Sequence, residues 1–218
     1  MKVTYFTPET IHSKAEAMLA QIGQNRRTNS INSRYIALLV LDMQDFFLEP
    51  VSHAYIPSAP AIIPNLSKLI AAFNQHHLLM IFTRHINTAE NAASMSRWWR
   101  DLITAEDPLS SITPQLDTTG QPVLIKSQYD AFHQTELEAI LKEQEIAQVV
   151  VSGVMTHLCC ETTARSAFMR GFEVFFVVDG TATYNEAFHQ ASLRNLAHGF
   201  ATLILTTDLL ATLSENES

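Results

Sequence analysis

The sequence predicts a three-layer α/β/α domain built on a parallel sheet. Short apolar runs alternate with segments of helical periodicity along most of the chain, and the runs are apolar at both odd and even positions. Strands that are apolar on both faces are typical of parallel sheets covered by helices. The alternation of strands and helices predicts right-handed crossovers, with ligands bound at the C-terminal ends of the strands.

Six apolar runs are predicted strands, and the segments between them are predicted helices. The strands are Tyr35–Asp42, Leu78–Thr83, Val123–Lys126, Val149–Gly153, Glu173–Asp179 and Thr202–Thr206. The helices are Ile62–Gln75, Ala92–Ile103, Glu136–Gln144, Glu161–Arg170 and Glu186–Ala197.

One more amphipathic helix is predicted before the first strand. Its apolar residues recur at helical spacing after Pro8, and they are Ile11, Ala15, Met18, Leu19 and Ile22. The polar connector Gly23–Ser33 follows this helix. We therefore expect a helical extension and connector over residues 1–32 and one main domain over residues 33–218.

The composition argues against several classes of protein. Apolar residues make up 47% of the chain, and its six Gly and eight Pro are scattered, which excludes a disordered or low-complexity protein. Lys and Arg number 14 against 22 Asp and Glu, a net charge of −8, so we expect no nucleic-acid or membrane partner. No apolar run approaches the roughly 20 residues of a membrane span, and no signal pattern opens the chain, so we expect a cytoplasmic protein.

Two charged residues stand at predicted strand ends. Asp42 follows the apolar run of the first strand, where burial would raise the pKa of its carboxyl unless a partner compensates. Lys126 ends the third strand. Asp42 could instead cap a turn, and the Lys126 side chain could extend to solvent. If both are buried together, each charge offsets the desolvation of the other.

The only two cysteines, Cys159 and Cys160, follow the fourth strand where a helix is predicted to begin. A disulfide between neighbours would be strained, so both are expected as thiols. Free N–H groups at a helix N-terminus favour a thiolate and can hold an oxyanion, although a small buried apolar role is the alternative. Neighbours on a helix point about 100° apart, so Cys159 can face the strand ends while Cys160 faces the sheet. Asp42, Lys126 and Cys159 together would suit nucleophilic catalysis.

Three motifs in order resemble the isochorismatase-like hydrolases. They are D-M-Q from Asp42, K-x-x-Y-x-A-F from Lys126, and G-V-x-T-H-x-C-x-x-x-T-A-R-x-A from Gly153, and the resemblance runs from about Tyr35 to Leu210. It implies a six-stranded parallel sheet in the order 3-2-1-4-5-6 and a catalytic triad of Asp42, Lys126 and Cys159. It also implies a homodimer or homotetramer.

The resemblance further implies a cis peptide bond between Val154 and Met155. The loop that follows, with Thr156 and Leu158, would direct backbone N–H groups at the oxyanion. His157 could be mistaken for the base of a cysteine protease, but because Asp42 and Lys126 already fill that role, we favour a loop-fixing function for it.

Differences among family members narrow the expected chemistry. Siderophore-type and phenazine-type isochorismatases usually carry Gly where Cys159 stands, so the thiol argues for acyl transfer. Nicotinamidases bind a metal through an Asp-x-His arrangement, whereas this chain has Thr83-Arg84-His85, so we expect no metal and no cofactor. Members acting on N-carbamoylsarcosine and related compounds share the T-H-x-C loop.

We therefore expect hydrolysis of a small amide, carbamoyl or ureide C–N bond through a Cys159 thioester. The alternatives are acid-catalysed cleavage of the vinyl ether of isochorismate and a non-catalytic ligand-binding protein.

Other residues are predicted to contact a small-molecule substrate. Arg84 could bind a carboxylate or form a surface ion pair. Of the neighbours Trp98 and Trp99, one could roof the pocket while the other packs in the core or an interface, and Trp98 is the predicted pocket residue. Further candidates, from the D-M-Q motif and from the segment after Lys126, are Gln44, Tyr129 and Phe132.

Overall fold

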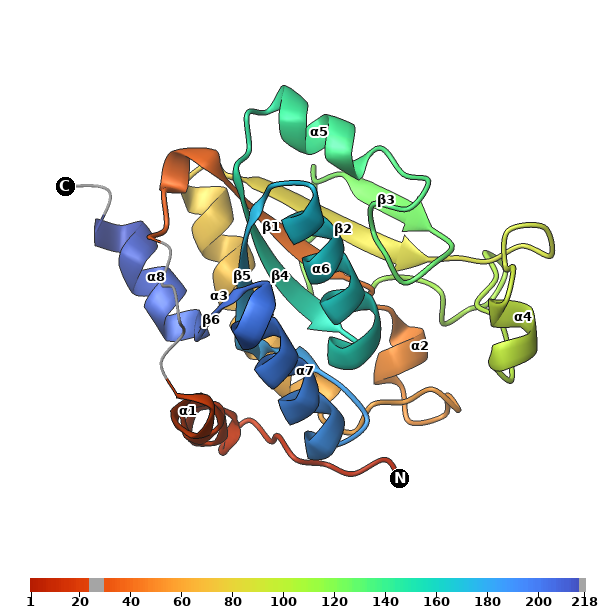
Figure 1. The fold of residues 1–218 in the computed structure, drawn as a ribbon. Coiled ribbons are helices and arrows are strands. Elements are labelled where there is room, and N and C mark those ends of the chain that lie inside the picture. Colours follow the sequence, from red (N-terminus) through yellow and green to blue (C-terminus); the bar gives the residue numbers. More distant parts are fainter. Residues whose placement is uncertain (24–29, 216–218) are drawn as a thin grey trace.

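The sheet has six parallel strands in the order β3-β2-β1-β4-β5-β6, as the family resemblance implies. A computed structural model describes residues 1–23 and 30–215 (Figure 1). The strands are β1 (Ile36–Leu41), β2 (Leu79–His85), β3 (Val123–Lys126), β4 (Gln148–Val154), β5 (Glu173–Ala182) and β6 (Thr202–Ile204). Every residue of β1 and β4 is buried, because the central strands are covered on both faces.

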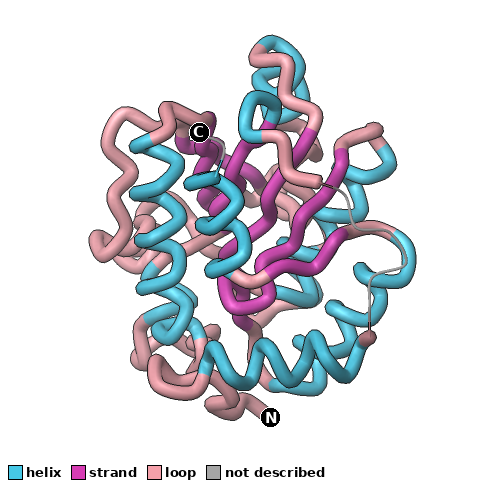
Figure 2. The backbone as a smooth tube through the Cα atoms, turned by 90° about the vertical axis from the view of Figure 1, so that its left-hand side faces the viewer, coloured by secondary structure: helices cyan, strands magenta, loops and turns pink. Residues whose placement is uncertain are grey.

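Helices cover both faces of the sheet (Figures 1 and 2). In Figure 1, α3 lies behind the sheet, and α5, α6 and α7 lie in front of it. The bounds are α3 (Ala59–Gln75), α5 (Leu137–Glu143), α6 (Glu161–Met169), α7 (Glu186–Gly199) and α8 (Thr206–Glu215), of which α8 packs against α3 and β5. This is the expected three-layer arrangement.

Several boundaries differ from the sequence prediction. The segment Ala92–Ile103 is helical only in the short α4 (Met95–Trp98), because Trp99 is extended and its indole N–H donates to Tyr129 Oη at 2.8 Å. Two short helical elements precede and follow β1, η1 (Ser33–Tyr35) and α2 (Asp45–Leu48), and neither they nor α8 were predicted.

Strand β3 is an exception to the expected burial on both faces. Val123 and Ile125 are exposed, because β3 lies at an edge of the sheet and pairs only with β2. Its last residue, Lys126, is buried. The edge strand therefore contributes its C-terminal end to the interior.

The N-terminal helix α1 (Ile11–Ile22) is present as predicted. It packs against α7 and β5, and its buried residues belong to the same hydrophobic core as the sheet. The segment predicted as an extension therefore shares the core, while residues 24–29 of the predicted connector lie outside the described residues. In the part of the chain that the structure describes, no helix is long and apolar enough to span a membrane.

The strand order reverses between β1 and β4, where their backbones approach closely. Gly153 pairs with Leu41 and has a φ of +102°. A Cβ atom at Gly153 would lie 2.1 Å from the carbonyl oxygen of Leu41. Only glycine fits this position. Its partner Leu41 directly precedes Asp42 on β1, and Gly153 itself lies one residue before the end of β4.

Candidate active site

A buried ion pair joins the ends of two strands. Lys126 Nζ, at the end of β3, lies 2.7 Å from Oδ2 of Asp42, which follows β1, and neither side chain is exposed. Asp42 has a φ of +52°, which turns the chain out of β1 at this point. Thr83 on β2 donates to Asp42 Oδ1 at 2.6 Å and accepts from the Asp42 backbone N–H at 3.1 Å. Asp42 is thus a paired carboxylate rather than a helix cap.

The ion pair determines the charge state of both groups. Burial by itself raises the pKa of Asp42, but the Lys126 ammonium overcomes this, so the pKa of that carboxyl lies below its ordinary value. Burial likewise lowers the pKa of Lys126, and the Asp42 carboxylate reverses this, so its pKa lies above the ordinary value. The compensation expected for a buried pair is present, and both groups are charged at neutral pH.

Cys159, in the turn that follows β4, completes the cluster. It lies in a π-helical turn, η2 (Thr156–Cys160), between β4 and α6, and its Sγ is 3.4 Å from Lys126 Nζ. Cys159 lines a cavity, whereas Cys160 is fully buried with its Sγ 3.9 Å from the carbonyl oxygen of Ser152 on β4. The two thiols point in different directions, as the helical spacing predicts.

The thiol is not activated in the way the sequence suggests. Burial, together with the Asp42 carboxylate, raises the pKa of Cys159 to about 12, against the smaller opposing effect of Lys126. The helix N-terminus was expected to favour a thiolate, but a desolvated sulfur beside a carboxylate keeps its proton at neutral pH. The site at rest therefore pairs a thiol with a ready base.

A neutral histidine extends the cluster along β2. His85 pairs with Lys126 across β2 and β3, and its Nδ1 lies 3.4 Å from Lys126 Nζ. Its Nε2 lies 2.8 Å from Asn87 Oδ1. Burial, with the nearby Lys126 charge, lowers the pKa of His85 to about 4. The sequence prediction ended this strand at Thr83, so the alternation that directs both Thr83 and His85 toward the site was missed.

The cavity beside Cys159 measures about 140 Å³, and its wall includes aromatic, aliphatic and charged side chains. Sequence reasoning identified Tyr129 and raised Trp99 as the partner of Trp98, but it missed most of the others. Those it missed include Phe46, Phe47, His53, His85, Asn87 and Tyr184. Phe46 and Phe47 lie on α2, His85 ends β2, and the others lie on loops that follow α2, β2 and β5. In the sequence, only the predicted strand ends indicated that these segments could approach the site.

Four residues predicted to contact substrate lie elsewhere. Trp98 is 78% exposed, and its neighbour Trp99 lines the cavity instead. Arg84 faces away from Thr83 and His85 along β2 and donates to Ser110, at 3.1 Å to its carbonyl oxygen. Gln44 is buried and bridges the backbones of His85 and Ser110. Phe132 is also buried, where its ring stacks on Phe172.

Residues of the loop predicted to hold the oxyanion face two directions, some toward the cavity and some away from it. The Val154–Met155 peptide bond is cis, as the resemblance implies. Met155 and Leu158 line the cavity, but the Leu158 N–H is engaged by the Met155 carbonyl oxygen at 3.1 Å. Thr156 points away, with its Oγ1 3.0 Å from His189 Nδ1.

His157 has the loop-fixing environment favoured from the sequence. Its Nδ1 lies 2.6 Å from Thr183 Oγ1, and its ring stacks on Phe188. The contacts connect the cysteine-bearing turn to the segment that follows β5.

The position of the Asp-x-His metal site does not fit a metal ion here. Thr83 replaces the Asp, and its hydroxyl is bonded to Asp42. His85 is bonded to Asn87 and faces the Lys126 ammonium. In residues 1–23 and 30–215, no three His, Cys, Asp or Glu side chains are grouped so as to hold a metal.

A doubly wound α/β/α sheet with a cysteine, a lysine and an aspartate at its strand ends defines the class of isochorismatase-like hydrolases. The family model described as "Isochorismatase domain" matches residues 36–208. The chain belongs to this family and is a hydrolase of the isochorismatase-like superfamily.

Named relatives and solved structures agree with this membership. The chain is 39% identical to "Nicotinamidase 3" of Arabidopsis thaliana over 183 residues, which cover 82% of this chain and 88% of that protein. It is 31% identical to "Enterobactin synthase component B" of Escherichia coli (strain K12), covering 87% of this chain and 67% of that protein. The structure of a cysteine hydrolase from Pseudomonas syringae pv. phaseolicola 1448A superposes with a TM-score of 0.83 at 25% identity, covering 86% and 96% of the two chains.

Proposed function

We propose that this hydrolase cleaves the C–N bond of a small amide, carbamoyl or ureide compound through a thioester on Cys159. The observation that carries the proposal is the thiol in the cavity wall beside a buried carboxylate and a buried ammonium. The 39% identity to a protein named as a nicotinamidase also supports amide hydrolysis.

The proposed reaction begins with proton transfer. The Asp42 carboxylate takes the Sγ proton of Cys159 as the sulfur attacks the carbonyl carbon, and the carbonyl π electrons move onto oxygen. The Lys126 ammonium, 3.4 Å from the sulfur, stabilises the negative charge that develops there. Because burial disfavours an isolated thiolate, proton removal and attack are expected to be coupled.

Collapse of the tetrahedral intermediate breaks the C–N bond. Asp42 returns its proton to the leaving nitrogen, which departs as ammonia or an amine and leaves a thioester on Cys159. Asp42 then takes a proton from water as the water attacks the thioester, and it passes this proton to the departing sulfur. The carboxylic or carbamic acid product is released, and the thiol and the Asp42 carboxylate are restored. No step requires a metal or another cofactor.

The cavity supports a small, planar substrate. Phe46, Phe47, Trp99, Tyr129 and Tyr184 line a space of about 140 Å³, which suits a flat ring better than a long chain. Nicotinamide, which the name of the relative indicates as that protein's substrate, is therefore the first compound to test, followed by N-carbamoyl compounds and ureides.

The decisive experiment compares Cys159→Ala with Cys160→Ala on this set of compounds. We expect Cys159→Ala to abolish turnover and Cys160→Ala to retain most of it, because only Cys159 reaches the cavity. Amide turnover that persists in Cys159→Ala would sink the covalent scheme.

Cleavage of isochorismate is the second candidate, favoured by the 26% identity to a protein named "Isochorismatase" from Bacillus subtilis (strain 168), of which the chain spans 56%. Pyruvate release that survives Cys159→Ala but not Asp42→Asn would identify that chemistry.

A further inference from the structure

The first six residues lie outside the family match, which begins at residue 36, yet Lys2 and Val3 contact Tyr184 in the cavity wall. The backbone N–H groups of Tyr5 and Phe6 both donate to Ser58 Oγ, at 2.8 and 3.0 Å. Ser58 is fully buried and precedes α3. This end of the segment is therefore fixed to the fold independently of the residues before it.

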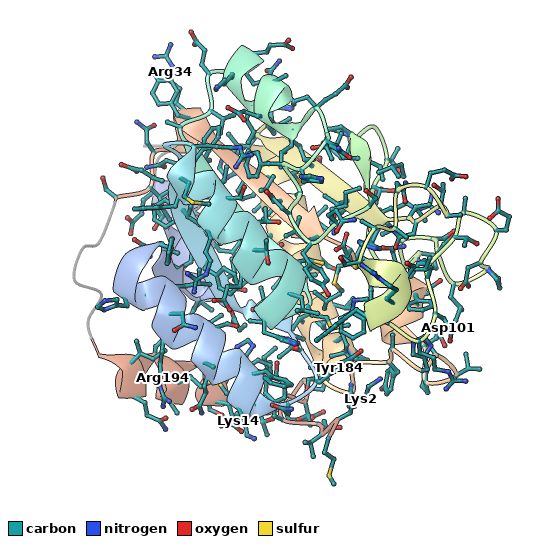
Figure 3. All side chains as sticks on the ribbon, turned by 45° about the vertical axis from the view of Figure 1, so that its right-hand side comes forward. Lys2, Lys14, Arg34, Asp101, Tyr184 and Arg194 are labelled. Atoms are coloured by element: carbon teal, nitrogen blue, oxygen red, sulfur yellow. The ribbon has the colours of Figure 1, made fainter. Side chains whose placement is uncertain are left out.

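Lys2 connects two walls of the cavity. Its ammonium lies 4.4 Å from the centroid of the Tyr184 ring and donates a hydrogen bond to the carbonyl oxygen of His53. Tyr184 follows β5 and His53 lies on the loop after α2, and both residues line the cavity. A cation–π contact and a hydrogen bond thus join loops that are far apart in sequence. Figure 3 shows Lys2 beside Tyr184.

The backbone reinforces the same connection. Val3 donates its N–H to the Tyr184 carbonyl oxygen at 2.8 Å, and the Asn185 side chain donates to the Met1 carbonyl oxygen at 3.2 Å. These bonds keep the segment beside Tyr184 but do not reach the His53 loop. In the described residues 1–6, Lys2 alone contacts both walls through its side chain.

We propose that Lys2 is a positioning residue that sets the upper size limit of the substrate. This proposal rests on the proposed function only for the identity of that substrate. By holding Tyr184 and the His53 loop together, Lys2 fixes the width of the cavity on this side of Cys159. Loss of the side chain releases the two loops from each other and admits bulkier molecules.

The test compares Lys2→Ala, Lys2→Arg and Lys14→Ala in the full chain. Arginine retains both the cation and a donor. Lys14 lies on α1 and is not among the residues that line the cavity, and its Nζ is 4.0 Å from Glu186 Oε2 at the start of α7 (Figure 3). Lys14→Ala therefore controls for the loss of a lysine charge close to Tyr184 in sequence. The Tyr5 and Phe6 bonds to Ser58 remain in every variant, so the segment stays attached.

The first measurement is the rate at which Cys159 reacts with N-ethylmaleimide and with a pyrene maleimide, located by peptide fragmentation. The ratio of the two rates cancels the thiolate fraction, so it reports access alone. In Lys2→Ala we expect the bulky-to-small ratio to rise about tenfold, since a cation–π contact and a hydrogen bond are lost. Lys2→Arg and Lys14→Ala should keep the wild-type ratio.

The second measurement, amide hydrogen exchange over residues 50–58 and 182–188, does not depend on thiol chemistry or on any substrate. Faster exchange in both segments of Lys2→Ala supports the proposal, even if neither maleimide reacts. Unchanged exchange together with an unchanged ratio overturns it. If neither maleimide reacts, the exchange alone decides the role of Lys2, and loss of amide turnover in Cys159→Ala decides the proposed function separately. If a substrate is found, its KM should rise in Lys2→Ala with little change in kcat.

Discussion

The buried pair of Asp42 and Lys126 predicts a large, reciprocal effect on stability. The charged atoms are 2.7 Å apart with no solvent exposure, and Coulomb's law at an effective dielectric constant of about 20 gives an attraction of about 6 kcal/mol. Removing one partner leaves the other charge buried and unpaired. We therefore expect Lys126→Met, and separately Asp42→Asn, to lower the free energy of unfolding by about 3–5 kcal/mol.

The double variant separates this cause from simple loss of packing. Asparagine keeps the oxygen that accepts from Thr83, and methionine fills most of the lysine volume, so the double variant has neither charge of this pair. We expect it to recover most of the lost stability while remaining inactive. Each free energy is to be measured by urea denaturation at pH 7, followed by circular dichroism.

Lys142→Met provides the matched control. Lys142 Nζ lies 2.6 Å from Glu138 Oε1, nearly the same separation, but the Lys142 side chain is 65% exposed. This change should affect stability little. The reasoning fails if Lys126→Met costs no more than Lys142→Met, or if its cost is the same with and without Asp42→Asn.

Three further outcomes are expected. Alkylation of Cys159 by iodoacetamide should be slower than that of a free thiol at pH 8 and should still rise above pH 9, since burial raises its pKa to about 12; a plateau below pH 8 would contradict this. The free energy of unfolding should fall as the pH drops from 6.5 toward 4, because burial lowers the pKa of His85 to about 4 and that of His189 to about 3. Each histidine then contributes up to about 1.4 kcal/mol per pH unit, which urea melts across this range can test against His189→Gln. Gly153→Ala should lose at least about 3 kcal/mol, because its Cβ would lie 2.1 Å from Leu41 O; Gly199→Ala, with no atom within 4 Å of its Cβ, should be nearly neutral in the same melts.

The strands could be predicted from the sequence because an apolar run with few polar residues is a local pattern that does not depend on contacts with distant residues. Asp42, Lys126 and Cys159 could then be predicted as site residues because they stand at or after the ends of three strands. These residues come together because the C-terminal ends of parallel strands lie at the same edge of the sheet. The apolar run of β3 predicted burial on both faces, but the strand order that the resemblance implies places this strand at the sheet edge, where Val123 and Ile125 are exposed.

The cavity wall was less predictable because it depends on contacts between distant loops. Trp99 rather than Trp98 lines the cavity, since its indole is held by Tyr129, 30 positions away. The thiol pKa was predicted in the wrong direction for a similar reason. Position at a helix start favours a thiolate, but the degree of desolvation around Cys159 depends on the whole packed site.

The protonated thiol has a consequence for oxidative damage. Peroxides oxidise the thiolate and react slowly with a thiol, so a cysteine that keeps its proton at rest resists conversion to sulfenic acid. Asp42 is a base in hydrogen-bonding contact with Cys159, but at rest it leaves the sulfur as a thiol and does not form the easily oxidised thiolate. The arrangement confines the reactive form of sulfur to the moment when a carbonyl carbon is present to accept it.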